Sequence, residues 1–131
     1  MRNNRATGEA KDHMREIFKE LRKEKFIARM NFRDCMSCAS YALGKLLEEA
    51  PEKQYTAYWH NQDEQRYKRS GQLSLRYFGR EKGDAEFAGL RIVEKLIERK
   101  AVFYWDGDQD RVIDVFDNLE VLKRELGEGR K

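Results

Sequence analysis

The stretch FIARMNFRDCMSCASYALGKLLEEAPEKQYTAYWH, residues 26–60, decides the fold class. Apolar and polar side chains alternate over residues 26–32, which predicts a short strand. Apolar residues recur at three- and four-residue spacing over 35–50, and Pro51 follows, which predicts a helix that ends before the proline. Residues 55–60 are aromatic and alternate again, so we expect a second strand. Helix and strand in succession predict a mixed α and β protein.

The same patterns extend the element order on both sides of this stretch. The expected elements are an amphipathic helix at 9–25, a polar link at 61–71 with room for one helical turn, strands at 73–78, 101–105 and 111–116, and helices at 84–100 and 119–126. The continuous apolar run at 101–105 predicts a central strand buried on both faces. The middle of the order, β-α-β-β-α-β, is the split βαβ order of ferredoxin-like domains. We therefore predict an α+β fold with a ferredoxin-like core, an added N-terminal helix, and a C-terminal hairpin strand and helix.

Length and composition restrict the class of protein. The 131 residues fit one domain, 1–131, with residues 1–8 and 127–131 expected to be frayed tails. The 27 basic and 24 acidic residues leave a formal charge of +3, which is too small to predict nucleic-acid binding from charge alone. There is no long apolar run and the N-terminus is polar, so we expect a cytoplasmic protein without a membrane partner.

Two cysteines, Cys35 and Cys38, stand at the junction of a predicted strand and helix. A helix N-terminus lowers the pKa of a thiol, so the CxxC spacing is compatible with a redox pair. The chain has a single proline, Pro51, and therefore lacks the proline that thioredoxin-like sites place opposite their cysteines. The same spacing can hold zinc if both histidines, His13 and His60, or His60 and a carboxylate such as Asp63, complete the site. A third interpretation packs both thiols into the core, on the apolar face of the helix.

Hydrogen-bonding side chains follow the predicted strand 55–60. Trp59, His60 and Asp63 come together at its end, where a rigid element can present them to a ligand. We interpret them as a candidate binding rim.

Basic residues are interleaved with aromatic ones in the next segment. Arg66, Arg69 and Arg76 lie close in sequence to Tyr67 and Tyr77. Positive charge combined with stacking surfaces can hold single-stranded nucleic acid, so these arginines are candidate binding residues. A solvated charged surface is the alternative.

Several of these segments resemble an uncharacterised family of small bacterial α+β domains, a domain of unknown function. The residues that carry the resemblance are Phe26–Phe32 leading into Cys35 and Cys38, Tyr58–Asp63, Leu73–Gly79 and Trp105–Gly107. It covers about residues 25–115. The resemblance implies a self-contained domain in which the cysteine pair and the His-x-x-Asp segment recur together as spatial neighbours. It supplies no activity.

No catalytic set is complete in the sequence, which favours a non-catalytic binding or regulatory domain whose partner is another protein. The competing hypothesis is a zinc or thiol site built from Cys35, Cys38 and His60, with Asp63 as orienter or base. Single-stranded nucleic-acid binding through the three arginines is the third.

Overall fold

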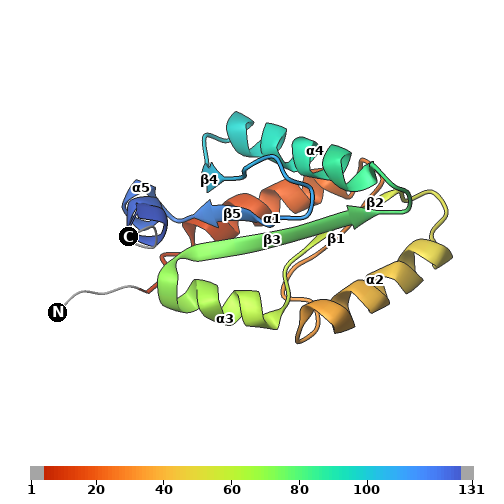
Figure 1. Ribbon diagram of the computed structural model, residues 1–131, viewed down its shortest axis with the longest axis horizontal. Coiled ribbons are helices and arrows are strands. Elements are labelled where there is room, and N and C mark those ends of the chain that lie inside the picture. The colour runs from red at the N-terminus through yellow and green to blue at the C-terminus, as the bar shows by residue number, and fades with distance from the viewer. Residues whose placement is uncertain (1–4, 128–131) are drawn as a thin grey trace.

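Residues 5–127 are described by the computed structural model, in which helices flank a five-stranded mixed sheet (Figure 1). The elements are α1 (Glu9–Leu21), β1 (Phe26–Arg29), α2 (Met36–Glu49), β2 (Tyr55–Tyr58), α3 (Asn61–Ser70), β3 (Gln72–Gly79), α4 (Asp84–Glu98), β4 (Val102–Tyr104), β5 (Ile113–Phe116) and α5 (Leu119–Leu122), which continues as a π-helical turn at Lys123–Gly127. The α+β class is confirmed. No helix in the described range has both the length and the apolar character needed to cross a membrane.

The strand order is β1-β2-β3-β5-β4, and only β1 and β2 are parallel neighbours within it. In a split βαβ unit another strand lies between the two parallel strands. Here α2 instead connects adjacent strands, so the strand order does not confirm the ferredoxin-like arrangement. Hydrophobic periodicity predicts the elements but not which strands pair, because pairing depends on contacts between distant segments.

One face of the sheet packs against α1 and α4. Phe18 of α1, Ile92 of α4, Leu75 of β3 and Val115 of β5 are buried together there. Burying one side chain of this size stabilises the fold by about 1.5–3 kcal/mol. This layer is therefore the main core.

The opposite face is covered by α2 over β1 and β2. Leu43 and Leu47 of α2 pack with Ile27 and Tyr58, forming a second, smaller core. Farther along this face the strands become polar: Ser74 of β3 donates a hydrogen bond to Asp114 of β5 over 2.6 Å. Because α2 stops short of these strands, the sheet face is left open next to the helix.

The polar link predicted at 61–71 is largely helical, as α3. Tyr67 is the one buried aromatic residue of α3, so the helix has too little apolar periodicity to be predicted from its sequence. It is stabilised instead by a capping box between His60 and Asp63 at its start, and by Gly71 in the left-handed region (φ 82°) at its end.

The prediction of a central strand at 101–105 is wrong. β4 lies at the edge of the sheet, where Phe103 packs on the main core and Tyr104 remains 39% exposed. An apolar run does not distinguish a central strand from an edge strand with one buried face. The hairpin itself is confirmed, because β4 and β5 pair antiparallel.

The predicted tails are partly outside the described residues, at 1–4 and 128–131. In the remaining segment the amide of Ala6 donates to the carbonyl of Lys68 over 3.1 Å, and the amide of Thr7 donates to the Asp117 carboxylate over 2.6 Å. Asp117 also accepts from the amide of Ala10 over 2.9 Å, so its charge lies at the N-terminus of α1.

Candidate functional site

Two helix N-termini meet at the carboxyl ends of the parallel strands β1 and β2. The amide of Phe32 donates to the carbonyl of Trp59 over 2.8 Å, and the amide of Asn61 donates to the carbonyl of Arg33 over 2.8 Å. These bonds tie the loop before α2 to the start of α3 (Figure 1). The CxxC and His-x-x-Asp segments therefore lie next to each other. The carboxyl ends of parallel strands are where open α/β sheets most often place their ligands.

The loop before α2 contains two left-handed residues that are not glycine. Asn31 has φ 48° and Arg33 has φ 64°. Asparagine adopts this region readily, whereas arginine does so at a cost, and such strain is often found at functional loops. The two turns bring Cys35 to the N-cap position of α2.

Cys35 and Cys38 form a close and accessible thiol pair. Their Sγ atoms lie 3.6 Å apart, Cys35 is half-buried, and Cys38 is exposed. The core-packing interpretation is therefore wrong. The buried stripe of α2 consists of Ala39, Leu43 and Leu47. Cys35 precedes the first helical residue, so it does not follow the helical period. Cys38 lies on the helix surface beside the buried stripe.

The two thiols differ in acidity. The pKa of Cys35 is lowered from its ordinary value, chiefly by the backbone amide of Cys38, then by the hydroxyl of Ser37 and the Cys38 thiol. The pKa of Cys38 is raised, first by its interaction with Cys35. This arrangement places the first negative charge of the pair on Cys35, at the positive end of α2.

His60 is a buried N-cap of α3 rather than a free ligand. Its Nδ1 accepts a hydrogen bond from the amide of Asp63 over 3.2 Å, and its Nε2 lies 3.4 Å from the Asp63 carboxylate. Burial lowers the pKa of His60, and the opposing charge of Asp63 reduces this effect without reversing it. Neutral His60 thus stabilises the start of α3.

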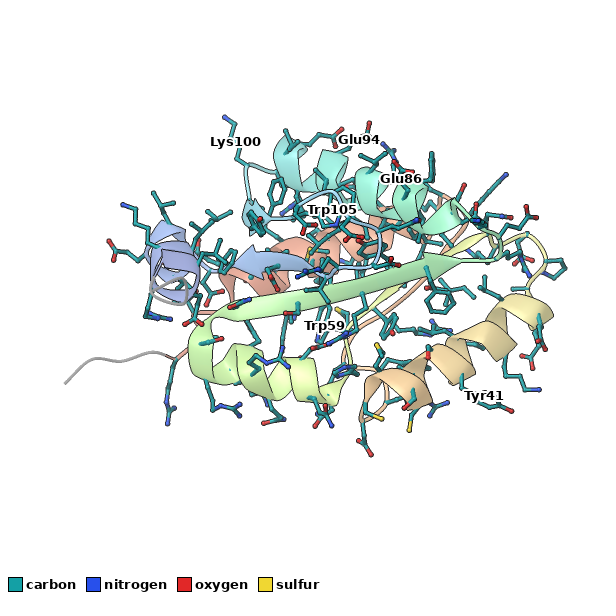
Figure 2. All side chains as sticks on the ribbon, in the orientation of Figure 1. Tyr41, Trp59, Glu86, Glu94, Lys100 and Trp105 are labelled. Carbon is teal, nitrogen blue, oxygen red and sulfur yellow. The ribbon has the colours of Figure 1, made fainter. Side chains whose placement is uncertain are left out.

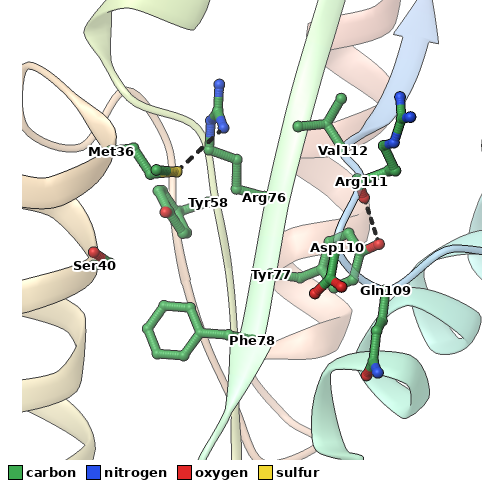
Figure 3. Close-up of a pocket in the computed structure, with 10 residues that line it drawn as sticks. All are labelled: Met36, Ser40, Tyr58, Arg76, Tyr77, Phe78, Gln109, Asp110, Arg111 and Val112. Atoms are coloured by element: carbon green, nitrogen blue, oxygen red, sulfur yellow. Dashed lines mark hydrogen bonds between the residues drawn. The ribbon is translucent and has the colours of Figure 1, made fainter.

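Asp63 joins α3 to β3 through its buried carboxylate. Arg76 of β3 donates to it from Nε over 2.9 Å and from a terminal nitrogen over 3.0 Å, a bidentate pair. Arg76 also lies 3.6 Å from the sulfur of Met36 in the first turn of α2 (Figure 3). Since both carboxylate oxygens are occupied, Asp63 holds α3 against β3 and is not an open base.

The remaining residues predicted as binding residues have different surroundings. Trp59 (labelled in Figure 2) is fully buried, with its ring centre 5.4 Å from that of Phe18 of α1, and its Nε1 donates to Glu64 of α3 over 2.8 Å. Arg66 and Arg69 are exposed on α3, with Arg66 3.4 Å from Asp63. The charge of Arg76 is already paired, so the three arginines do not form one open basic surface.

Cys35, Cys38 and His60 do not form a metal site in the structure. Across residues 5–127, no three histidine, cysteine or carboxylate side chains lie close enough to hold a metal ion. His60 has its Nδ1 lone pair directed at a backbone amide, which removes it as a ligand.

A pocket of ≈ 220 Å³ opens on the sheet face beside the first turns of α2. Figure 3 shows Met36 and Ser40 of α2 on one side, Tyr58 and Arg76 on its floor, and the loop before β5 on the other side. The sequence could not reveal this pocket, because its walls come from segments more than 70 residues apart, such as Met36 and Arg111.

Fold and site together define a small α+β domain with a vicinal dithiol at a helix N-terminus. The chain belongs to the family described as a domain of unknown function (DUF6891), whose model matches residues 6–125. The resemblance noted from the sequence is thereby confirmed at the level of the family. No curated protein and no solved structure matches the chain.

Proposed function

We propose that this domain performs thiol–disulfide exchange, with Cys35 as the attacking thiolate and Cys38 as the resolving thiol. The observation that carries the proposal is the accessible pair of Sγ atoms 3.6 Å apart, in which the N-cap thiol has the lowered pKa. A disulfide bond is about 2.05 Å long, so the sulfurs need to approach by about 1.5 Å, which rotation of the half-buried Cys35 and the exposed Cys38 side chains can supply.

The exchange proceeds in two balanced steps. The Cys35 thiolate attacks one sulfur of a substrate disulfide, forms a mixed disulfide and releases the other sulfur as a thiolate. Cys38 then loses its proton to solvent and attacks the Cys35 sulfur, which forms the Cys35–Cys38 disulfide and releases the second substrate thiolate. The substrate disulfide is reduced by two electrons and the protein dithiol is oxidised by two.

His60 and Asp63 support this chemistry by position. Their capping box and the Asp63–Arg76 pair hold the start of α3 against the loop that carries Cys35. The proposal assigns no proton transfer to either side chain. A zinc role for the cysteines has no support in the described residues.

The other sequence-based hypotheses stay predictions. A non-catalytic binding or regulatory domain with a protein partner is compatible with the same site if oxidation changes the surface that the partner contacts. A cytoplasmic location would keep the dithiol reduced at rest. Single-stranded nucleic-acid binding through Arg66, Arg69 and Arg76 has no further observation beside it: Arg66 and Arg69 are exposed, and the charge of Arg76 is paired with Asp63.

Trapping the mixed disulfide tests the proposal. We expect the Cys38→Ser variant to accumulate a stable adduct at Cys35 when it is mixed with bis(2-hydroxyethyl) disulfide, as measured by peptide mass. Wild-type protein should instead lose about 2 Da, with no adduct, because Cys38 resolves the intermediate. The Cys35→Ser variant should react much more slowly. Equal and slow adduct formation at both cysteines, without an internal disulfide, would contradict the proposal.

A further inference from the structure

A second cavity, on the outer side of α2, contains Cys38 in its wall. Its volume is ≈ 620 Å³, within the range of about 300–1,000 Å³ that is typical of small-ligand pockets. We name it the α2 groove, and it is distinct from the pocket on the sheet face, which Met36 and Ser40 line.

One wall of the α2 groove is a single stripe of the helix. Cys38, Tyr41, Lys45 and Glu49 recur at three- and four-residue spacing along it. Tyr41 is 71% exposed and extends from α2 away from the sheet (Figure 2). A ligand in the groove would contact the Cys38 sulfur at one end and the aromatic ring next to it.

The other wall comes from β1 and the loop that follows it, through Arg29, Phe32 and Arg33. The guanidinium of Arg33 lies 4.7 Å from the centre of the Phe32 ring, and Lys45 lies 5.9 Å from the centre of the Tyr41 ring. Positive charge and aromatic surface therefore alternate across the groove.

The charge of the groove is unbalanced. Arg29, Arg33 and Lys45 form no salt bridge with any residue in the described part of the chain. Glu49 is the one acidic residue lining the groove, eleven residues along α2 from Cys38, which is about 16 Å in a helix. The lining of the groove therefore carries a net positive charge, and the acidic residue closest in sequence to the thiols, Asp34, is not part of that lining although its charge acts on Cys38.

We propose that the α2 groove binds a small anionic disulfide, the substrate of the exchange at Cys35 and Cys38. This inference rests on the proposed function and adds its substrate class. Carboxylates of the substrate complement the unpaired cations, its apolar part lies on Phe32 and Tyr41, and its disulfide is presented beside the thiol pair. A disulfide in an acidic polypeptide is the alternative occupant that the experiment must separate.

The test compares rate constants for oxidation of the reduced full chain by oxidised glutathione, which is anionic, and by bis(2-hydroxyethyl) disulfide, which is neutral. The readout is the ratio of the anionic to the neutral rate constant. We expect the Arg29→Gln/Lys45→Gln variant to lower this ratio about tenfold relative to wild type, the size expected for two exposed ionic contacts. Arg33 is left in place because its charge also lowers the pKa of Cys38.

The matched control removes two exposed lysines that do not line the groove, in the variant Lys82→Gln/Lys100→Gln, with Lys100 at the far end of α4 (Figure 2). It should keep the wild-type ratio, and raising the salt concentration should lower the ratio in wild type. A ratio that does not respond to the groove variant, while the neutral disulfide still forms the Cys35–Cys38 bond, overturns the groove assignment alone. Failure of both disulfides to form that bond overturns the proposed function. If an acidic peptide disulfide reacts far faster than oxidised glutathione, the claim that the substrate is a small molecule is overturned.

Discussion

Cys35 and Cys38 differ in acidity because only Cys35 stands at the helix N-cap. The pKa of Cys35 is lowered by the Cys38 amide, the Ser37 hydroxyl and the Cys38 thiol, whereas the hydrogen bond with Cys35, and then the charge on Cys35, raise the pKa of Cys38. The sequence shows the CxxC spacing and predicts a helix from residue 35, one residue before the observed start of α2 at Met36. The accessibility of the thiols could not be predicted, because Cys35, as the N-cap residue, lies outside the helical period, and Cys38 lies beside the buried stripe of Ala39, Leu43 and Leu47.

Alkylation by iodoacetamide at increasing pH, followed for each cysteine by peptide mass, measures this difference. We expect Cys35 to reach half-maximal rate at a lower pH than Cys38. Ser37→Ala should raise the pH of half-maximal alkylation of Cys35, because it removes a polar group 3.7 Å from the Cys35 sulfur. Ser40→Ala should leave this pH unchanged. Equal values for the two thiols would contradict the assignment of Cys35 as the attacking group.

His60 makes stability depend on pH below neutrality. Burial lowers its pKa in the folded state, so the unfolded chain binds a proton first and stability is lost as the pH falls below the unfolded value of about 6.5. His60→Asn keeps a capping acceptor without an ionisable ring. We therefore expect the free energy of unfolding, measured with urea at pH 7.5 and 5.5, to fall less in the variant than in wild type. The loss of unfolding free energy in wild type can exceed that in the variant by up to about 1.4 kcal/mol per pH unit. An identical fall would mean that His60 titrates freely.

At the scale of elements, apolar periodicity predicts α1, α2 and α4 and fails for α3. The start of α3 is stabilised by polar contacts of His60 and Asp63, which leave no hydrophobic stripe to recognise. Arg76, the partner of Asp63, is on β3, thirteen residues farther along the chain. The interaction that orders the start of α3 can therefore be seen only in the three-dimensional structure.

Gly89 allows α4 to pack closely against Trp105 in the loop before β5. A Cβ atom at this position would lie 2.9 Å from the Trp105 ring and 3.1 Å from Tyr77. Trp105 donates a hydrogen bond to the Tyr77 hydroxyl over 2.8 Å, so neither ring can move freely. We expect Gly89→Ala to destabilise the fold by about 1–3 kcal/mol, measured by urea unfolding, although alanine is the better helix former.

Gly44 is the control for this substitution. It lies inside α2, and a Cβ atom there would meet nothing within 4 Å. Gly44→Ala should stabilise the fold by about 0.5–1 kcal/mol through helix propensity alone. Equal effects of the two substitutions would show that the contact between α4 and Trp105 carries no energy.

At the scale of the whole molecule, the strand order determines where the site lies. Adjacent parallel strands β1 and β2 bring the starts of α2 and α3 together, and a split arrangement would have separated them. The α+β class and the hairpin could be predicted from alternation and apolar runs. The order of the strands could not, since the sequence pattern of a strand records which faces are buried and not its neighbours.

The equilibrium between dithiol and disulfide forms of Cys35 and Cys38 tests the proposed chemistry most directly. The folded protein is equilibrated in buffers of reduced and oxidised dithiothreitol or glutathione, and the Cys35–Cys38 peptide is quantified by mass. We expect a reversible two-electron transition between about −270 and −120 mV, the range of CxxC redox proteins, with unchanged circular dichroism. A pair that forms no internal disulfide in the folded state, or forms it only after unfolding, would contradict the proposal.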